Sequence, residues 1–198
     1  AFGSCGRAPH YHCAGQLMRA GAMTFTLVLK RAALFIAIVV IWALIVAMAR
    51  AATPERTIVA FSGFAPGTIV VKTGERRLYY VIDGQRALRF PVGVGRGGKT
   101  WTGTARVEGK YVRPAWSPPD EIRRERPSLP QVIAGGAANN PMGAAALTLR
   151  GGEYAIHGTN RPASIGGFVS YGCIRMYNRD IVELFSLVDI GTPVIVER

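Results

Sequence analysis

The sequence is poor in cysteine and histidine, with three of each among 198 residues. Beyond residue 50 it keeps one of each, Cys173 and His157. A single cysteine excludes a disulfide within that part of the chain, and one cysteine with one histidine does not make a zinc ligand set. The other four have the chemistry of zinc ligands, but no second ligand pair supports a fold-stabilising site: Cys5, His10, His12 and Cys13. We therefore predict no metal and no cofactor.

Acidic residues are also scarce, and none precedes Glu55. Lys and Arg number 24 against 12 Asp and Glu, which gives a net charge of +12. Such an excess suits an anionic neighbour. No run of Lys and Arg interleaved with aromatic residues is present, so we predict no nucleic-acid partner. At 18% charged and 49% hydrophobic residues, the composition excludes a disordered chain.

One long apolar run, residues 32–49 (AALFIAIVVIWALIVAMA), follows the basic pair Lys30-Arg31. Its length falls between that of a signal-peptide core and that of a membrane span. Small residues at positions 47 and 49 favour cleavage, whereas Arg50 favours retention as an inner-membrane anchor. We predict that residues 1–51 are an N-terminal extension with a signal or anchor helix, followed by a linker over residues 52–67.

The remainder, residues 68–198, has the pattern of a mostly β domain. Its apolar residues come in short runs separated by Gly, Pro and Asp rather than at helical spacing. A short helix is predicted over 179–188, capped by Asn178. Strands are predicted over residues 68–73, 77–82, 87–92, 104–112, 146–150, 154–157 and 193–197. The irregular stretch 113–143 between them is either a lid over a cleft or an ordinary proline-stiffened connection.

Residues 93–100 (GVGRGGKT) satisfy the letters of a phosphate-binding loop. Phosphate binding requires that this loop open a helix, whose N–H groups face the anion. The residues that follow, 101–112, have the composition of a strand instead. We therefore predict a glycine-rich connection to a strand rather than a nucleotide site.

Cys173 and His157 are both predicted at positions from which a side chain can reach a cleft, namely a tight turn and a strand end. Gly172 permits a tight turn that presents the Cys173 thiol and aims backbone N–H groups at one point, and His157 ends a predicted strand. A lone cysteine is commonly a buried core residue, but this context favours a nucleophile with a histidine base. A neighbouring imidazolium would lower the thiol pKa from about 8.5 and give a thiolate.

The segment from His157 to Asn160 (HGTN), followed by Ser170 to Met176 (SYGCIRM), resembles the catalytic motif of the L,D-transpeptidases (YkuD-like domains). Fifteen residues separate His157 from Cys173. The resemblance extends over roughly residues 68–197 and includes the Trp116-Ser117-Pro118 segment. It implies a β-sandwich of the L,D-transpeptidase type, with the active site between a sheet and loops.

The resemblance further implies a cysteine acyltransferase of peptidoglycan. Cys173 would attack the diaminopimelate carbonyl of a tetrapeptide stem and expel D-Ala, with His157 as base and the Gly158 carbonyl orienting its ring. The backbone N–H groups of Tyr171, Gly172 and Cys173 would line the oxyanion hole. An amine of a second stem, or of an outer-membrane or wall-attached protein, would then take the acyl group. This chemistry implies a periplasmic location.

The sequence leaves the roles of several residues undecided. Tyr171 stands where many family members have a second histidine. Arg175 either binds a substrate carboxylate or braces the turn through a salt bridge. The other candidates for substrate contact are Thr159, Asn160 and Ser170. The alternatives for the whole chain are an L,D-carboxypeptidase or other hydrolase on the same scaffold, and a non-catalytic wall-binding module with a buried thiol.

Overall fold

Residues 31, 34–44, 57–151 and 154–198 are described by a computed structural model. The chain divides into two units, Ala1–Thr53 and Pro54–Arg198. In the first unit residues 34–44 are helical, and their apolar side chains are exposed. No helix within the described ranges has both the length and the apolar character that a membrane crossing requires. The predicted signal or anchor segment, 32–49, lies partly outside the described residues, and the early Cys and His residues lie wholly outside them.

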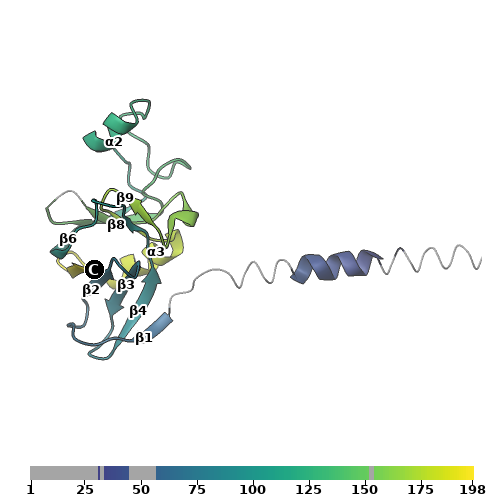
Figure 1. The fold of residues 1–198 in the computed structure, drawn as a ribbon, viewed down its shortest axis with the longest axis horizontal. Helices are drawn as coiled ribbons and strands as arrows, with labels where there is room; N and C mark the ends of the chain where they lie inside the picture. The colour runs from purple at the N-terminus through teal and green to yellow at the C-terminus, as the bar shows by residue number, and fades with distance from the viewer. Residues whose placement is uncertain (1–30, 32–33, 45–56, 152–153) are drawn as a thin grey trace, which may run out of the picture. The chain divides into compact units, whose positions relative to one another are not determined.

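The second unit is mostly β, as predicted (Figure 1). Two α-helices and one 3-10 turn accompany the strands in its described part: α2 (Asp120–Glu125), α3 (Asn178–Leu187) and η1 (Pro162–Ser164). The strands are β1 (Thr57–Ala60), β2 (Ile69–Lys72), β3 (Arg77–Val81), β4 (Arg86–Pro91), β5 (Val94–Gly95), β6 (Gly103–Val112), β7 (Ala145–Leu149), β8 (Ala155–His157), β9 (Phe168–Ser170), β10 (Ile174–Arg175) and β11 (Pro193–Glu197).

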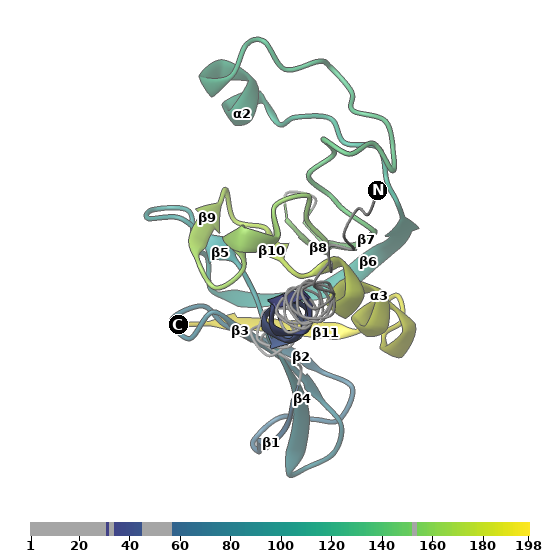
Figure 2. The same ribbon diagram turned by 90° about the vertical axis from the view of Figure 1, so that its right-hand side faces the viewer.

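Strand β6 joins two layers of sheet. Its first half pairs with β11 and its second half with β7, and the register shifts between Val107 and Gly109. Such an irregularity bends and twists a strand. The order β1-β4-β3-β2-β11-β6-β7-β8-β10 therefore folds over on itself, so that β2–β4 face β7, β8 and β10 (Figure 2). Strands β5 and β9 form a separate pair.

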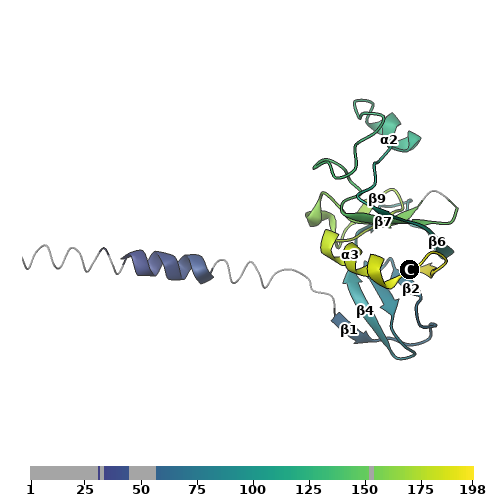
Figure 3. The ribbon, with the colours of Figure 1, turned by 180° about the vertical axis from the view of Figure 1, so that it is seen from behind.

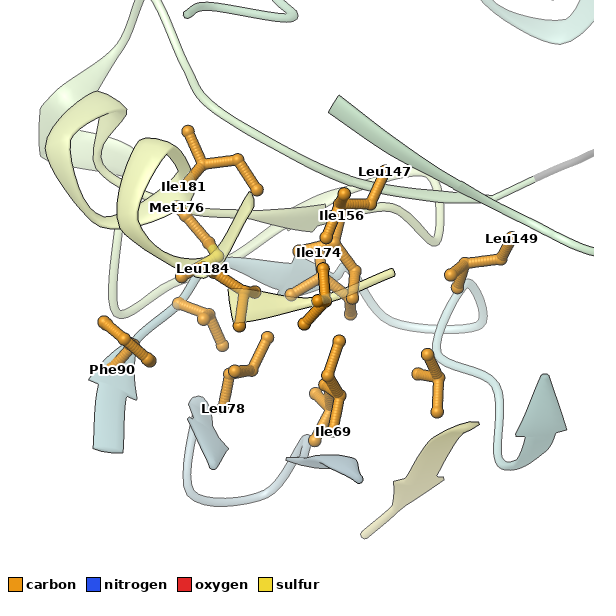
Figure 4. Packing of buried hydrophobic residues seen from close by; sticks show 14 of the residues in the cluster. Ile69, Leu78, Phe90, Leu147, Leu149, Ile156, Ile174, Met176, Ile181 and Leu184 are labelled. Atoms are coloured by element: carbon orange, nitrogen blue, oxygen red, sulfur yellow. The ribbon is translucent and has the colours of Figure 1, made fainter. Parts of the chain in front are cut away.

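The main core lies between these two layers. Ile69, Leu78 and Phe90 point from β2, β3 and β4 towards residues of the other layer, among them Ile156 and Ile174 (Figure 4). Helix α3 packs against β7 and β8 and adds its own apolar side chains to this core (Figure 3). Because side chains alternate along a strand, one face of β8 and β10 is committed to the core. The opposite face is left for the site.

The segment predicted as a linker, residues 52–67, contains strand β1, so this prediction is corrected. The second face of the β2–β4 sheet is also apolar, with Val70 and Tyr79 buried on it. Phe61 covers this face and stacks on Tyr79 with ring centroids 4.3 Å apart. Thr57–Ala60 accordingly pairs with β4 in antiparallel register rather than running free.

The stretch 113–143 is an ordered arm rather than a plain connection. It contains α2, and its two sides are joined by a bridge between Trp116 and Ile133. The buried Asn140 closes the arm, because its side-chain amide donates to the carbonyls of Pro114 and Ala134 at 2.9 Å. Figure 2 shows this arm carrying α2 away from the sheets. Its closed base fixes where the residues just before β7 lie.

The packing of the core predicts that Phe90→Ala strongly lowers the free energy of unfolding. Phe90 is fully buried between the layers, and removing such a ring costs about 3–5 kcal/mol in transfer and cavity free energy. The free energy of unfolding in urea measures this loss. Val112→Ala, at a site that is 70% exposed, is the matched control and should change stability by less than about 0.5 kcal/mol. Equal effects of the two substitutions would contradict this packing.

Candidate active site

Parallel pairing of β8 with β10 brings the one described histidine, at the end of β8, close to the one described cysteine, which directly precedes β10. Ile174 is opposite Ile156, and Arg175 is opposite His157. Both isoleucines are buried in the core. Since side chains alternate, His157 and Arg175 point to the other face, and so does Cys173, one residue before β10. The register therefore gathers the three polar groups on one face.

A cavity of about 450 Å³ opens on this face. Cys173 is only partly buried and lines it, so the thiol is not a sealed core residue. His157, Ser170 and Arg175 line the same cavity, and Tyr171 does as well. The arm between β6 and β7 supplies further walls: Trp116, Pro119, Glu121, Ile122, Pro141 and Met142. The cavity can admit a substrate chain to the sulfur.

The His157 ring is buried and held by a backbone carbonyl. Its Nδ1 lies 2.7 Å from the oxygen of Gly158. A carbonyl only accepts hydrogen bonds, so Nδ1 carries the proton and Nε2 has the lone pair in the neutral ring. The backbone of Pro141 also acts on this ring and, like the Gly158 carbonyl, favours its protonated form. Burial lowers the pKa of His157 from 6.5 to about 4, with a further lowering from Arg175. The ring is neutral at pH 7 and can accept a proton.

The thiol is neutral as well. Burial raises the pKa of Cys173, although a backbone hydrogen bond from Ala155 and the charge of Arg175 both oppose this. The expectation that an imidazolium lowers the thiol pKa is therefore wrong, because desolvation disfavours the charged form of both groups. The pair rests as thiol and imidazole.

Gly158 is required by a close approach of Asn178. A Cβ at Gly158 would lie 2.2 Å from Asn178 Oδ1. That oxygen accepts N–H bonds from Ala144 and Thr159, both at 3.0 Å. Asn178 thus starts α3 but does not cap it, contrary to the sequence prediction. It holds in place the backbone that orients His157.

The turn that carries Cys173 is held from several sides. Ser170 Oγ donates to the Cys173 carbonyl at 2.6 Å and accepts the N–H of Gly172 at 3.1 Å. Gly172 has φ +121°, and a Cβ there would lie 2.3 Å from the Tyr154 ring. Trp101 stacks on Tyr154 and donates to the Gly172 carbonyl at 3.0 Å. Of the three N–H groups predicted for an oxyanion hole, that of Gly172 is thus already used by Ser170.

The remaining predicted contact residues differ in position. Thr159 is buried and lines neither of the two cavities at this end of the molecule; its hydroxyl accepts the N–H of Arg161. Asn160 lines the neighbouring cavity. Arg175 lines both cavities, and its Nε is buried without a hydrogen-bond partner. Within the described ranges no salt bridge braces it, so that alternative for Arg175 finds no support.

Sequence reasoning missed helix α2, which ties the arm to the turn that carries Cys173. Tyr171 Oη donates to Glu125, and Arg96 pairs with the same carboxylate at 2.6 Å while lying over the Tyr171 ring. Lys99 pairs with Glu121. The available signal was Pro118-Pro119 followed by two acidic and then two basic residues, the charge order that a helix dipole favours. These contacts close one wall of the cavity.

The buried neutral His157 predicts acid-sensitive stability. Its folded-state pKa is about 4 and its ordinary value is 6.5, so between these values the unfolded chain binds a proton that the folded chain does not. The free energy of unfolding should fall by up to about 3 kcal/mol as pH drops from 6.5 to 4, and this loss should then level off. Urea denaturation across this range measures it. His157→Gln should flatten that part of the curve; an unchanged curve would contradict a neutral buried ring.

The Glu125 contacts predict that Glu125→Gln loosens α2. The lost charge removes the pairing with Arg96 and weakens the bond from Tyr171. Trypsin should then cleave after Arg123 and Arg124 several-fold faster, and 1 M salt should speed cleavage of the unaltered chain in the same way. Glu108→Gln, an exposed change on β6, is the control. Equal cleavage of both variants would show that Glu125 does not hold α2.

Comparison with known proteins gives matches over most of the second unit. A family model described as the L,D-transpeptidase catalytic domain (YkuD) matches residues 66–196. The probable L,D-transpeptidase ErfK/SrfK of Escherichia coli is 43% identical over 135 residues, which cover 64% of this chain and 42% of that protein. The putative L,D-transpeptidase YkuD of Bacillus subtilis is 57% identical over 58 residues, or 29% of this chain and 35% of that protein. The chain thus spans less than half the length of these relatives.

Solved structures show the same fold at lower identity. An L,D-transpeptidase from Mycobacterium smegmatis superposes with a TM-score of 0.53 at 20% identity, covering 66% of this chain and 58% of that one. The catalytic domain of an Enterococcus faecium L,D-transpeptidase, acylated by ertapenem, gives 0.52 at 21% identity and covers 69% of this chain and 100% of that one. With the family model matching well over half of its residues, the chain belongs to the L,D-transpeptidase catalytic domain family, YkuD.

Proposed function

We propose that the protein is an exported peptidoglycan L,D-transpeptidase with Cys173 as nucleophile. One observation carries the proposal: a partly accessible thiol and a buried neutral imidazole line one cavity, with the imidazole proton directed to Gly158. In such a ring the lone pair that can take a proton is on Nε2. Family membership and the Cys–His arrangement both favour acyl transfer.

In the acylation step, Cys173 Sγ attacks the diaminopimelate carbonyl carbon while its proton passes to His157 Nε2. The carbonyl oxygen becomes an oxyanion, and we assign its stabilisation to the N–H groups of Tyr171 and Cys173, since Gly172 donates to Ser170. Each such donor is commonly worth about 3–4 kcal/mol. The C–N bond to D-Ala then breaks, and the imidazolium returns the proton to the leaving amine.

In the transfer step, an amine attacks the thioester carbon, the C–S bond breaks, and an amide forms. His157 takes the proton released by the amine and returns it to the sulfur, which restores the neutral pair. The amine comes from a second stem in a 3→3 cross-link, or from an outer-membrane or wall-attached protein. Replacement of the amine by water gives the hydrolase alternative.

Arg175 fits a role in substrate binding. Its guanidinium borders the cavity, its Nε lacks a partner, and no described acidic residue pairs with it. An arginine fork matches a carboxylate in two parallel hydrogen bonds. We assign Arg175 to a carboxylate of the bound stem, and Asn160 to the neighbouring wall.

The location follows from the substrate and from the apolar run. Peptidoglycan stems lie outside the inner membrane, so the catalytic domain acts in the periplasm under this proposal. Residues 32–49 supply the export signal. Whether this run is cleaved or kept as an inner-membrane anchor is decided by the N-terminal mass of the mature protein.

Incubation with a disaccharide-tetrapeptide tests the proposal. The full chain should release D-Ala and form cross-linked dimers, visible by mass spectrometry. Cys173→Ala should abolish release, because no nucleophile remains, and His157→Gln should slow it by about 10²–10⁴-fold. Ser186→Ala, an exposed change on α3, should leave it unchanged.

The products also separate the alternatives. Free tripeptide without dimers indicates the hydrolase. D-Ala release that persists in Cys173→Ala would refute the proposed chemistry. No release, together with a thiol that resists iodoacetamide in the folded chain, would favour the wall-binding module.

A further inference from the structure

A second cavity of about 560 Å³ lies beside the one that holds Cys173. The two share five lining residues: Trp116, Ile122, Pro141, Tyr171 and Arg175. Arg175 thus stands at the border between them. Neither His157 nor Cys173 lines the second cavity. A ligand that reaches Cys173 can continue past Arg175 into this space.

The second cavity is lined by four arginines: Arg96, Arg126, Arg161 and Arg175. None of its lining residues in the described part of the chain is acidic. The charge of Arg96 is met by Glu125. In the described part of the chain, Arg161 and Arg175 form no salt bridge, and Arg126 forms none either, although its charge also acts on Glu125 from a longer distance. We call this space the arginine cavity.

The guanidinium groups of Arg126 and Arg161 lie close enough to affect that of Arg175. Burial lowers the pKa of Arg175, and the charges of Arg161 and Arg126 lower it further. Arg126 and Arg161 are exposed and can turn towards water, whereas Arg175 is partly buried and its backbone is held by the β8–β10 pairing. Positive charges around the partly buried Arg175 repel it. This repulsion destabilises the cavity when it is empty and favours the binding of an anion in it.

The form of the anion follows from the walls. An arginine fork prefers carboxylate or phosphate, while Leu129, Ile133 and Val169 provide apolar surface for methyl and methylene groups. A peptide with more than one free carboxylate combines both features. A tetrapeptide stem is such a peptide, with one carboxylate on its terminal D-Ala and one on the diaminopimelate side chain.

We propose that Arg126, Arg161 and Arg175 make the arginine cavity a selector for stem peptides whose carboxylates are free, against stems in which they are amidated. This rests on the proposed function for the identity of the peptide. Amidation removes the negative charge and one acceptor of each fork, which leaves a guanidinium unpaired. Arg126 and Arg161 are binding residues here and take no part in the proton transfers.

Steady-state kinetics on the full chain test the selection. Stems with a free diaminopimelate carboxylate should have a kcat/KM about 10- to 100-fold above that of the amidated stem. Arg126→Gln and Arg161→Gln should raise KM for the free stem, keep kcat, and erase the preference; Arg161→Lys should keep part of it. Arg150→Gln, outside the arginine cavity, is the control. Equal kcat/KM for both stems in the unaltered chain would overturn the proposal.

A binding experiment separates this proposal from the proposed function. In Cys173→Ala, calorimetric titration should show tighter binding of the free stem than of the amidated stem, with the difference reduced by 0.5 M salt and by Arg161→Gln. If the difference is present but the unaltered chain releases no D-Ala, the selector stands and the acyl-transfer proposal fails. If D-Ala is released but both stems bind alike, the selector fails alone.

Discussion

The site depends on one pairing, that of β8 with β10 in parallel register. The pairing involves only two residues of each strand. Ile156 and Ile174 enter the core, so the next residues, His157 and Arg175, lie on the opposite face. A slip by one residue would bury His157 and Arg175 in the apolar core and expose the isoleucines. The hydrophobic core therefore fixes the register, and the register fixes which polar groups meet at the cavity.

Burial also determines the protonation states of His157 and Cys173. Burial of the imidazole and partial burial of the thiol favour the neutral form of each group, so no thiolate–imidazolium pair accumulates before a substrate arrives. Under the proposed function, the proton of Cys173 then moves only when the substrate carbonyl is in place. Arg175 belongs to this balance, because its charge further disfavours a protonated His157 and opposes the rise in the thiol pKa. One cation thus borders both the reacting pair and the arginine cavity.

Much of the fold could be predicted because the long strands have strong patterns. The predicted strands over 68–73, 77–82 and 87–92 match β2, β3 and β4 within one or two residues, and the last strand matches β11. Strands β5 and β10 could not be predicted, because two residues hold no period. Strand β1 was missed because it pairs with β4 where the second apolar face of the β2–β4 sheet is covered. That requirement arises from the tertiary structure and not from the local sequence.

The candidate site could be predicted to the level of residue types but not of contacts. Cys173 and His157 stand out because the rest of the second unit offers no other cysteine or histidine. The use of Asn178 to hold Gly158, and of Glu125 to hold Tyr171, needed the three-dimensional arrangement, since these partners lie 20 and 46 positions apart in the chain. The direction of the pKa shifts also depends on burial, which spacing does not reveal.

The proposed chemistry depends on a neutral His157 whose Nε2 takes the proton of the Cys173 thiol. Nitrogen NMR of the full chain labelled with ¹⁵N-histidine, with the His157 signals assigned through His157→Gln, tests this at pH 7. It should show a ring protonated only on Nδ1, and the Nε2 resonance should move when Cys173 is alkylated. A doubly protonated ring, or an Nε2 signal that does not respond to the alkylation, would contradict it.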